Sequence, residues 1–325
     1  MEERISLHGW GSYLIRRILI IFPLLVGVSI VLFTLISLMP GDALDLMVSP
    51  DLGREQLELR RERLGLDQPI YIRYIRWMGE LVQGNLGFST TTRRPVAEMI
   101  GARLGPTLLL MGTALVVSLV IGVLLGTVSA LKQRSLTDHV ATLGAFAGVC
   151  IPNFFLALVC IYLFSVILGW LPSSGMRTPG MPFSLLDRVS RLIMPLFVLS
   201  LQSIAIFTRY MRSSMLEVIH ADYVRTARAK GLAERSVVYK HALRNALMPI
   251  VTVLGLRVRW LFGGSVIIER VFSWPGIGRL MVDSVFTRDT GVIMGIVMIS
   301  ALLVMVGNLL ADVAYAIVDP RIRFS

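Results

Sequence analysis

Long apolar runs constrain the fold of this chain more than any other feature. Each run is close to the roughly 20 residues that a helix needs to cross the hydrocarbon core of a bilayer. The predicted spans cover residues 18–39, 107–131, 140–168, 192–211, 247–268 and 292–317. Hydrophobic residues make up 55% of the chain and charged residues 16%, a balance that soluble domains do not show. The sequence therefore predicts an all-α integral membrane protein with six transmembrane helices.

The first apolar run follows Arg16 and Arg17, as the apolar part of a signal peptide would. However, the run is longer than a signal peptide requires, and no small-residue cleavage pattern follows Pro40. We therefore interpret residues 18–39 as a retained transmembrane helix.

Basic residues in the short connecting segments predict the orientation of the spans. Lys and Arg gather in the N-terminal segment 1–17, in the connection after residue 131, in segment 212–246 and in the tail 318–325. Cytoplasmic loops carry such an excess of positive charge. An even number of spans puts both termini on one side, which we predict to be the cytoplasm. Segment 269–291 is then an external loop.

The segment 40–106 has nine basic and nine acidic residues and is predicted to be external, because long segments translocate largely regardless of charge. Proline and glycine positions predict three helices in it: from Ser49 to near Gly65, from Pro69 to Gly84, and from Pro95 to Leu104. The third is expected to lie along the membrane surface before Pro106 turns the chain inward. This insertion is either a platform for an external partner or a lid over the helix ends.

Glycines four residues apart predict close contacts between helices in the membrane. The pairs are Gly122 with Gly126, Gly144 with Gly148, and Gly291 with Gly295. Such pairs indicate a helical bundle and say nothing about its substrate.

The polar stretch 221–249 lies between two apolar runs and reads as helix, glycine turn, helix. Gly231 suits the left-handed residue that ends a helix, and Arg228 and Lys230 suit the negative end of the helix dipole. Three apolar residues flank the turn and could dock into a partner's groove: Val224, Ala227 and Leu232. The alternative is an ordinary positively charged cytoplasmic loop.

Catalytic and metal-binding motifs are absent from the sequence. It contains no G-x-x-x-x-G-K-[ST] phosphate loop, no H-E-x-x-H, no G-x-S-x-G and no C-x-x-C. Cys150 and Cys160 are separated by about 15 Å of helical rise and cannot form a disulfide bond with each other. We expect no catalytic residue, no metal site and no cofactor in this chain, and no binding to nucleic acid.

Two motifs together resemble a known family. Residues 223–232 read YVRTARAKGL, and residues 269–278 read ERVFSWPGIG. In order and spacing these stretches, with residues 64–69, 84–89 and 151–154, are similar to the peptide/nickel-type (dipeptide and oligopeptide) permeases of binding-protein-dependent ABC importers. The external-side motif residues are Glu269, Phe272, Pro275, Gly276 and Gly278. Those of the last span and the tail are Asn308, Asp312, Asp319, Pro320 and Arg321.

The resemblance implies a type I importer permease in a bacterial inner membrane. Such a chain works with a second permease subunit, two cytoplasmic ATPases that bind ATP and Mg²⁺, and an external solute-binding protein. It moves peptides or similar solutes inward by alternating access. The resemblance assigns ATPase coupling to Tyr223, Val224, Arg225, Ala227, Arg228, Lys230, Gly231 and Leu232. Which substrate is carried (dipeptide, oligopeptide, glutathione-like peptide, opine or metal chelate) stays open.

The chain departs from this family in the fifth predicted span. The stretch after Gly255 is usually uncharged in the family, yet here it contains Arg257 and Arg259. An arginine at this depth costs at least ~2.5 kcal/mol unless it faces a cavity or a partner. We expect at least one of the two to line the translocation path and to favour anionic substrates or peptide carboxylates. The alternative is an ion pair with Asp312 or with another subunit.

Two other classes of function remain to be weighed. A self-sufficient channel or secondary transporter is expected to show inverted repeats with broken helices, or proton-relay carboxylates in the membrane; apart from Asp312, the spans contain neither. A membrane-embedded enzyme needs a nucleophile and a base, and no such pair is visible. The importer permease fits best.

Overall fold

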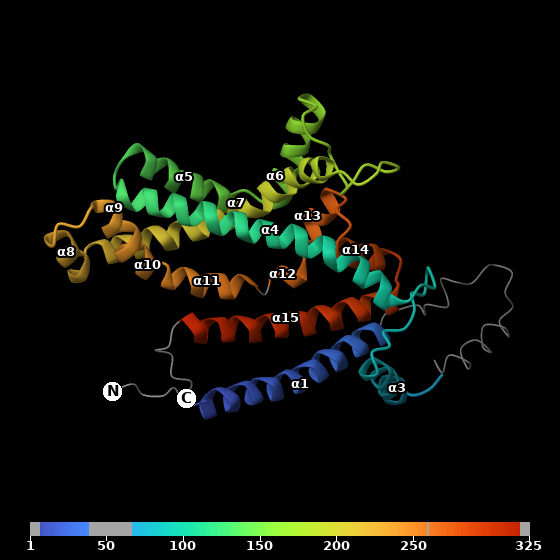
Figure 1. Cartoon of the computed structure of the whole chain (residues 1–325). Coiled ribbons are helices and arrows are strands. Elements are labelled where there is room, and N and C mark those ends of the chain that lie inside the picture. The colour runs from blue at the N-terminus through green and yellow to red at the C-terminus, as the bar shows by residue number, and fades with distance from the viewer. Residues whose placement is uncertain (1–6, 39–66, 259, 319–325) are drawn as a thin grey trace. The chain divides into compact units, whose positions relative to one another are not determined.

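The computed structural model describes residues 7–38, 67–258 and 260–318 (Figure 1). These residues form helices and connecting turns, with one isolated antiparallel bridge between Phe88 and Pro95. The all-helical prediction is therefore confirmed for the described part of the chain. The helix predicted from Ser49 to Gly65 lies outside the described residues.

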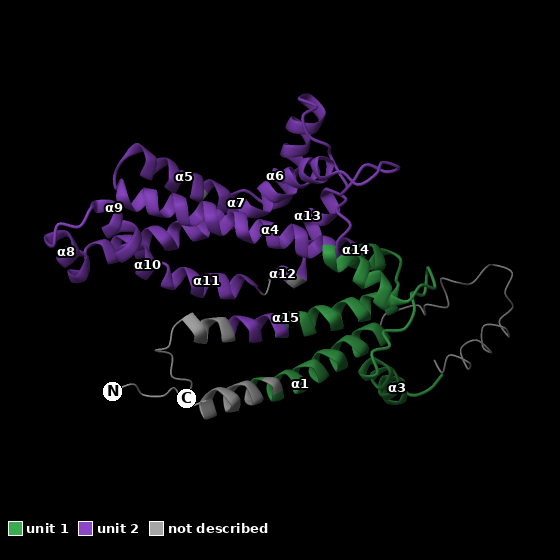
Figure 2. Cartoon of the chain, in the orientation of Figure 1, with its two compact units in different colours: residues 1–105, 280–305 green, residues 106–279, 306–325 purple. Residues whose placement is uncertain are grey.

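The chain divides into two compact units (Figure 2). Unit 1 comprises residues 1–105 and 280–305, and unit 2 comprises residues 106–279 and 306–325. The boundaries between the units fall inside three helices: α4 (Val96–Leu131), α14 (Ile277–Phe286) and α15 (Thr290–Val318). Each unit is therefore built from segments that are distant in sequence.

Among the described residues, four helices are long and apolar enough to cross a membrane. They are the part Leu19–Ser37 of α1 (Leu7–Ser37), α4 (Val96–Leu131), α7 (Leu185–Ile219) and the part Thr290–Asp312 of α15 (Thr290–Val318). Each overlaps one predicted span, since length and apolarity are what the prediction used.

The predicted span 140–168 is not one straight helix. It is formed by α5 (Leu136–Cys150), α6 (Asn153–Cys160) and the π-helical segment η1 (Ile161–Ile167), with a sharp bend at Ile151 and Pro152. Proline disfavours a helical conformation in the residue before it, and Ile151 accordingly has ψ 123°. Taken as one bent span, this pair would make a fifth crossing.

The predicted span 247–268 is divided more completely. It contains α11 (Met248–Val258), α12 (Trp260–Gly263) and the start of α13 (Val266–Val271). Gly264, at φ +63°, separates the last two helices in a conformation that favours glycine. α11 rises only about 16 Å, roughly half the thickness of a bilayer core. A sixth crossing helix is thus not confirmed, and the six-span arrangement stays a prediction.

In unit 1, α3 (Ile70–Val82) matches the prediction closely. It begins directly after Pro69, and Gly84 follows it at φ +83°. Tyr74 contacts α1 through a 2.9 Å hydrogen bond between its hydroxyl and Ser29 Oγ. The Phe33 ring lies 5.5 Å from the Tyr74 ring, so α3 is fastened to α1 by aromatic packing.

The prediction that the chain turns at Pro106 was wrong. A single helix, α4, runs from Val96 through Pro106 to Leu131. Proline removes one backbone donor but is tolerated in membrane helices where neighbouring groups satisfy the freed backbone. In unit 2 the carbonyl oxygen of Pro106 accepts a 2.9 Å hydrogen bond from the indole nitrogen of Trp274. This contact with a residue far away in sequence could not be read from the local pattern.

Unit 2 is held together by α4 and α5 packed against α7. A Cβ atom on Gly122 would lie 2.4 Å from Cβ of Phe207, and one on Gly126 would lie 2.6 Å from Cβ of Met211. A Cβ on Gly148 would lie 3.1 Å from Cγ of Leu201, whereas one on Gly144 would meet nothing within 4 Å. Within unit 1, a Cβ on Gly291 would lie 2.6 Å from the carbonyl oxygen of Phe88, and one on Gly295 would lie 2.5 Å from Cγ1 of Val96. The prediction of close contacts between helices holds for four of the six glycines; Gly291 approaches the loop residue Phe88 instead, and Gly144 has no close neighbour.

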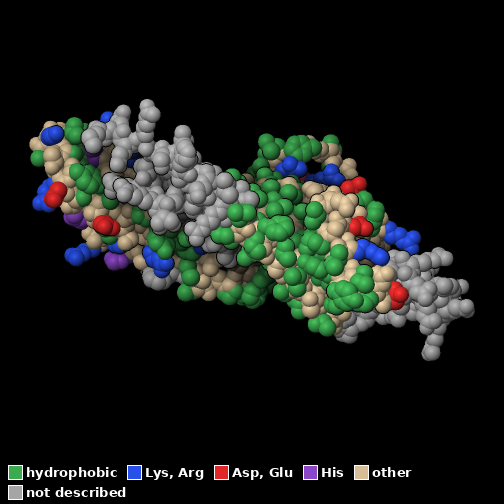
Figure 3. Space-filling view, turned by 90° about the horizontal axis from the view of Figure 1, so that it is seen from below, with side chains coloured by type: hydrophobic (Ala, Val, Ile, Leu, Met, Phe, Trp, Pro, Cys, Tyr) green, Lys and Arg blue, Asp and Glu red, His purple; other side chains and the backbone are tan. Residues whose placement is uncertain are grey.

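Apolar side chains cover much of the described surface. Leu136, Leu143 and Val166 are 79, 68 and 68% exposed, although water disfavours such groups. Lys, Arg and His side chains gather at the left of Figure 3, where α8 (Asp222–Ala229) and α10 (Leu243–Ala246) lie. The surface is that of a membrane protein with a basic polar end.

Candidate functional site

The polar segment after α7 folds as helix, glycine turn, helix, as predicted. α8 ends at Ala229, Gly231 has φ +74°, and α9 (Glu234–Ser236), the π-helical η2 (Val237–Ala242) and α10 follow. A side chain at a φ of this sign is strained, so glycine is the residue that this turn requires.

The two faces of α8 differ in exposure. Val224 is fully buried and Ala227 is 6% exposed, and both pack with Met211, Met215 and Val238 in the core of unit 2. These two side chains therefore seat α8 on its own chain and are not presented to a partner. The opposite face is open, with Tyr223 and Leu232 44 and 43% exposed and Arg225 75% exposed.

An ion pair closes the turn after α8. Arg228 donates to Glu234 at 2.8 Å and to the carbonyl oxygen of Ile219 at 3.4 Å. The Arg228 guanidinium lowers the pKa of Glu234 below its usual value. Lys230 is exposed and adds positive charge to the same surface. The segment thus offers a fixed helix with an open face of aromatic, aliphatic and basic side chains.

A second site is a cavity of about 240 Å³ inside unit 2 that Arg257 lines. Asn153 at the start of α6, and Gln202 and Ser203 on α7, supply its other polar side chains with Ser265. Nη1 of Arg257 donates to Ser203 Oγ at 3.3 Å. The remaining lining residues are apolar or glycine: Met111, Ala114, Leu115, Leu199, Leu261 and Gly264. Arg259 lies outside the described residues.

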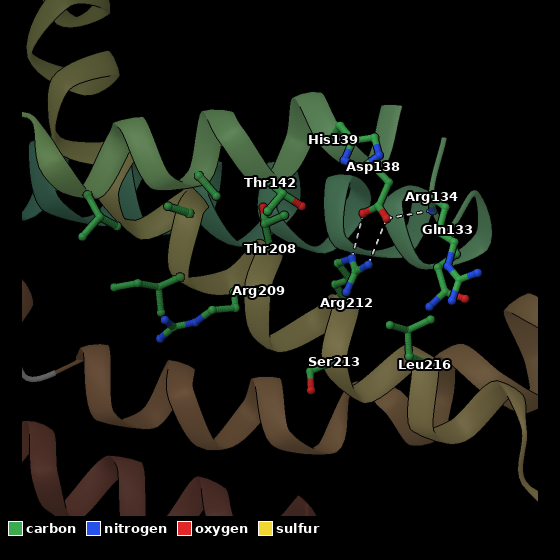
Figure 4. Close-up of a pocket in the computed structure, with 14 residues that line it drawn as sticks. Gln133, Arg134, Asp138, His139, Thr142, Thr208, Arg209, Arg212, Ser213 and Leu216 are labelled. Atoms are coloured by element: carbon green, nitrogen blue, oxygen red, sulfur yellow. Dashed lines mark hydrogen bonds and ion pairs between the residues drawn. The ribbon is translucent and has the colours of Figure 1, made fainter. Parts of the chain in front are cut away.

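A third site is a larger cavity of about 780 Å³ between α5 and α7 (Figure 4). Asp138 and Arg212 point toward each other in it, with Nε to Oδ1 at 2.7 Å and Nη2 to Oδ2 at 2.9 Å. Asp138 is 4% exposed and also accepts from Ser129 Oγ and from the backbone N–H of Arg134. Arg209 extends away from this pair along the cavity. Sequence patterns do not predict this pair, because its two residues are 74 positions apart.

The ERVFSWPGIG motif folds into a buried carboxylate site. The Glu269 side chain is fully buried and accepts hydrogen bonds from Thr107 Oγ1 at 2.9 Å and from the backbone N–H of Arg279 at 3.0 Å. Burial raises the pKa of Glu269, while hydrogen bonds from Arg279, Thr107 and Gly278 act in the opposite direction. A Cβ atom on Gly276 would lie 2.3 Å from Cδ of Glu269, so glycine is needed there.

The other motif residues are placed as follows. Phe272 is 2% exposed and packs with Met194, Val198 and Ile268. Pro275 lies in the turn between α13 and α14 (Ile277–Phe286), next to the fully buried Trp274. Asn308 and Asp312 lie on α15, half-buried. Asp319, Pro320 and Arg321 lie outside the described residues.

In unit 1, a buried carboxylate fixes the loop before α4 to the start of α15. Asp289 is 2% exposed and accepts from Ser89 Oγ, Thr90 N and Thr91 Oγ1 at 2.5, 3.0 and 2.8 Å. Burial alone would raise the pKa of Asp289, but these hydrogen bonds and that from Val292 N outweigh it and hold the pKa below its usual value. The cluster uses all its donors internally and is structural.

Comparison with known protein families now decides between the classes left by the sequence. The family described as binding-protein-dependent transport system inner membrane component matches residues 122–324, and the N-terminal region described for such membrane components matches residues 11–111. The chain belongs to this family. It is a transport permease and an inner-membrane component, which disfavours a membrane-embedded enzyme.

Individual members of this family are similar over almost the whole chain. The oligopeptide transport system permease protein AppB of Bacillus subtilis is 46% identical over 315 residues, which cover 97% of this chain and 100% of AppB. The glutathione transport system permease protein GsiC of Escherichia coli K12 is 40% identical over 313 residues, covering 96% of this chain and 99% of GsiC.

Solved structures are more distant from this inner-membrane component. A chain of the MetNI methionine ABC transporter, in an inward-facing conformation, is 18% identical, with a TM-score of 0.49 over 66% of this chain and 96% of that one. At this level of likeness the structural match adds nothing to the family assignment.

Proposed function

We propose that this permease belongs to an ATP-driven importer of peptides or peptide-like solutes that depends on an external solute-binding protein. The proposal is supported by similarity over nearly the full chain to permeases named for oligopeptide and glutathione transport. Glutathione and oligopeptides share amide bonds and a free carboxylate, so the common substrate chemistry is peptide-like. Transport proceeds by alternating access, in which rigid groups of helices rock about the path.

The observation that carries this proposal is the construction of α8. Val224 and Ala227 pack α8 into the core beside α7, and Arg228, Glu234 and Gly231 fix its C-terminal turn, so that α8 and α7 move together. The exposed residues Tyr223, Arg225, Lys230 and Leu232 form the contact surface for an ATPase. Aromatic and arginine side chains dominate the binding energy of such surfaces.

The membrane arrangement in this proposal has six crossings, with both termini cytoplasmic and segment 40–106 as an external helical insertion. α5 with α6 and η1 form the bent third crossing, and α11, α12 and the start of α13 form the interrupted fifth. Interrupted helices occur in membranes where the irregular backbone lines a cavity, and the 240 Å³ cavity adjoins this interruption at Gly264.

The motif residues have different roles in this proposal. Glu269, Phe272, Pro275, Gly276 and Gly278 hold the corner at the start of the external loop 269–291, because each is buried or forms the turn there. Asn308 and Asp312 on α15 and the tail residues Asp319, Pro320 and Arg321 keep the assignment that the motif gives them, as parts of the last span and its cytoplasmic end.

The complete transporter contains a second permease subunit, two cytoplasmic ATPase subunits that bind ATP and Mg²⁺, and the binding protein. This chain contributes no catalytic residue; hydrolysis takes place on the partners. Selection of the solute rests largely on the binding protein, and passage rests on the two permeases.

The experiment is reconstitution of the chain with its ATPases, its second permease and its binding protein, with measurement of peptide uptake. The double variant Tyr223→Asp/Leu232→Asp changes only exposed residues of the α8 surface. We expect it to lose co-purification of the ATPases and ATP-driven uptake while keeping its folded state. Tyr71→Asp on α3 is the matched control, since Tyr71 is 62% exposed and lies on the predicted external side.

Two results would contradict the proposal. Retention of both ATPases by the double variant would remove α8 from the contact. Uptake of peptide by the purified chain alone would instead establish a self-sufficient transporter.

A further inference from the structure

The Arg257 cavity holds a positive charge that has no counter-charge among the described residues. Across residues 7–38, 67–258 and 260–318, no carboxylate lies within ion-pair distance of Arg257. Its recorded polar contact there is the hydroxyl of Ser203, at 3.3 Å. A guanidinium has five N–H donors, so most of those of Arg257 have no acceptor among the residues that the structure describes. Within the described residues no ion pair joins Arg257 to Asp312; Asp312 has a contact of its own, and Arg259 lies outside the described residues.

The acidic residue Glu269 lies beside the wall of this cavity, but its carboxylate does not pair with Arg257. It lies behind Gly264, whose Cβ position is 2.9 Å from Glu269 Oε1. Its two oxygens are occupied by Thr107 Oγ1 and the backbone N–H of Arg279. The carboxylate of Glu269 therefore belongs to the motif corner, and the cavity itself stays positively charged.

The other polar groups around the cavity are suited to a carboxylate. Asn153 and Gln202 each carry an amide group with two donors, and Ser203 and Ser265 each carry a hydroxyl. Arginine binds carboxylates through two parallel hydrogen bonds, a geometry that lysine does not offer. The amide oxygens of Asn153 and Gln202 can in addition accept the N–H of a neighbouring peptide bond.

The volume and the charge of the cavity limit the kind of ligand that it can bind. Sites for whole small molecules are typically ~300–1,000 Å³, so the 240 Å³ of this cavity suits one end of a peptide and not a whole peptide. A single arginine balances one negative charge. The cavity therefore favours a monoanionic carboxylate over a phosphate group with two charges.

The face of α7 that lines the Arg257 cavity continues along the helix and also lines the larger cavity. Gln202 lines the Arg257 cavity, and Ile206, Arg209, Ser213 and Leu216 line the larger cavity. These residues recur every three or four positions, so they share one face of α7. Arg209 follows Gln202 by about 10 Å of helical rise. A solute leaving Arg257 along this face meets a second positive charge.

We propose that Arg257, with Ser203, Gln202 and Asn153, binds the free carboxylate of the substrate during its passage through the membrane. The inference rests on the proposed function, since it names the substrate end that this permease contacts. It makes a peptide's free C-terminus, or an acidic side chain in the same position, a determinant of passage in addition to selection by the binding protein.

The test compares one tripeptide with a free C-terminal carboxylate and the same tripeptide with a C-terminal amide. Equilibrium binding of each is measured on the purified complex of permeases and ATPases without the binding protein. We expect the wild-type complex to bind the free acid at least tenfold more tightly than the amide. In Arg257→Gln this preference should fall below twofold, with Arg257→Lys in between because the charge remains and the paired hydrogen bonds are lost.

Uptake in proteoliposomes with the binding protein provides the second readout. The same binding protein serves wild type and variants, so the ratio of variant to wild-type uptake for the free acid reports on the permease. Arg257→Gln should lower this ratio at least tenfold, and the matched control Lys132→Gln, an exposed cation outside both cavities, should leave it near one.

The possible failures are distinguishable. If the wild-type transporter imports no peptide, the proposed function is wrong. If it imports peptide, but the wild-type complex shows no preference for the free acid or Arg257→Gln keeps that preference, the carboxylate site alone is wrong. Equal loss of both peptides in Arg257→Gln, with unchanged preference in binding, would give Arg257 a structural role.

Discussion

Two arginines of unit 2 line cavities bordered by α7, but only Arg212 forms an ion pair with a described carboxylate. Arg212 forms two hydrogen bonds of 2.7 and 2.9 Å with the carboxylate of Asp138, which is almost fully buried. Arg257 contacts one neutral hydroxyl at 3.3 Å. A paired buried charge is part of the scaffold, whereas an unpaired one keeps its donors for a ligand. The comparison teaches that pairing, more than residue type or burial, separates structural from binding arginines here.

The Asp138 carboxylate, which pairs with Arg212, is itself held by further hydrogen bonds. Ser129 Oγ and the backbone N–H of Arg134 occupy the carboxylate positions that Arg212 leaves free. Four donors from three segments thus converge on one carboxylate. No comparable set of acceptors surrounds Arg257 in the described part of unit 2, where amide and hydroxyl groups lie at the cavity wall instead.

The largest expected effect comes from breaking the paired site. Asp138→Ala leaves Arg212 without its partner in a partly buried position, and such losses cost about 3 kcal/mol. We expect the thermal unfolding midpoint of the purified complex to fall by several degrees. The matched control is Asp222→Ala, which removes a carboxylate that is 91% exposed and pairs with Arg225 on the surface. The control should change stability by less than about 0.5 kcal/mol.

A double variant makes this first prediction sharper. Asp138→Ala with Arg212→Met removes both charges, so part of the lost stability should return. If Asp138→Ala has no larger effect than Asp222→Ala, the pair is not structural and the contrast with Arg257 disappears.

The sequence allowed accurate prediction where the determinants are local. The turn after α8 follows from Gly231, the start of α3 from Pro69, and the close approach of α4 to α7 from Gly122 and Gly126. Apolar length located the four long helices. These features depend on backbone conformation and side-chain size, which neighbouring residues fix.

Prediction failed or stopped where distant residues decide. Pro106 does not end a helix, and its carbonyl accepts a hydrogen bond from Trp274, 168 positions away. Arg257 was noticeable as a charge in an apolar run, but Ser203, Gln202 and Asn153 around it come from other helices. The Asp138–Arg212 pair left no trace in the pattern beyond Ser135, which caps α5 and indicates only that a helix begins there.

A smaller effect, of opposite sign, is expected from the unpaired arginine. Arg257→Met removes a half-buried charge whose desolvation no described carboxylate offsets and keeps much of the aliphatic stem. Replacing such a charge with an apolar side chain is neutral or stabilising, here by about 1 kcal/mol. The unfolding midpoint of the ligand-free complex should rise by a few degrees. Arg212→Met in the same assay should lower it, because Asp138 is then left buried and unpaired.

The sign of this difference is the decisive measurement. A midpoint that falls in Arg257→Met as far as it does in Arg212→Met would mean that Arg257 has a partner in another subunit. In that case the alternative of an inter-subunit ion pair would replace the carboxylate site.

The smallest effect is expected where charges are paired but exposed. Arg228 and Glu234 lie 2.8 Å apart with side chains 39 and 62% exposed, and solvent screens such pairs. The hydrogen bonds from Arg228 lower the pKa of Glu234 in the folded chain. The contribution of the pair to folding stability is therefore fully present above the unfolded pKa of about 4.3, and it is lost only as the pH falls through the lower folded value.

ATPase activity stimulated by the loaded binding protein should then show no transition from this pair between pH 6 and 8, about two pH units above the carboxylate range. Glu234→Gln should change that activity less than twofold at pH 7, with Asp222→Asn as the matched control on the same segment. A large loss of ATPase activity in Glu234→Gln but not in Asp222→Asn would show that an exposed ion pair also matters on the α8 surface. Arg228 would then be a structural arginine, like Arg212.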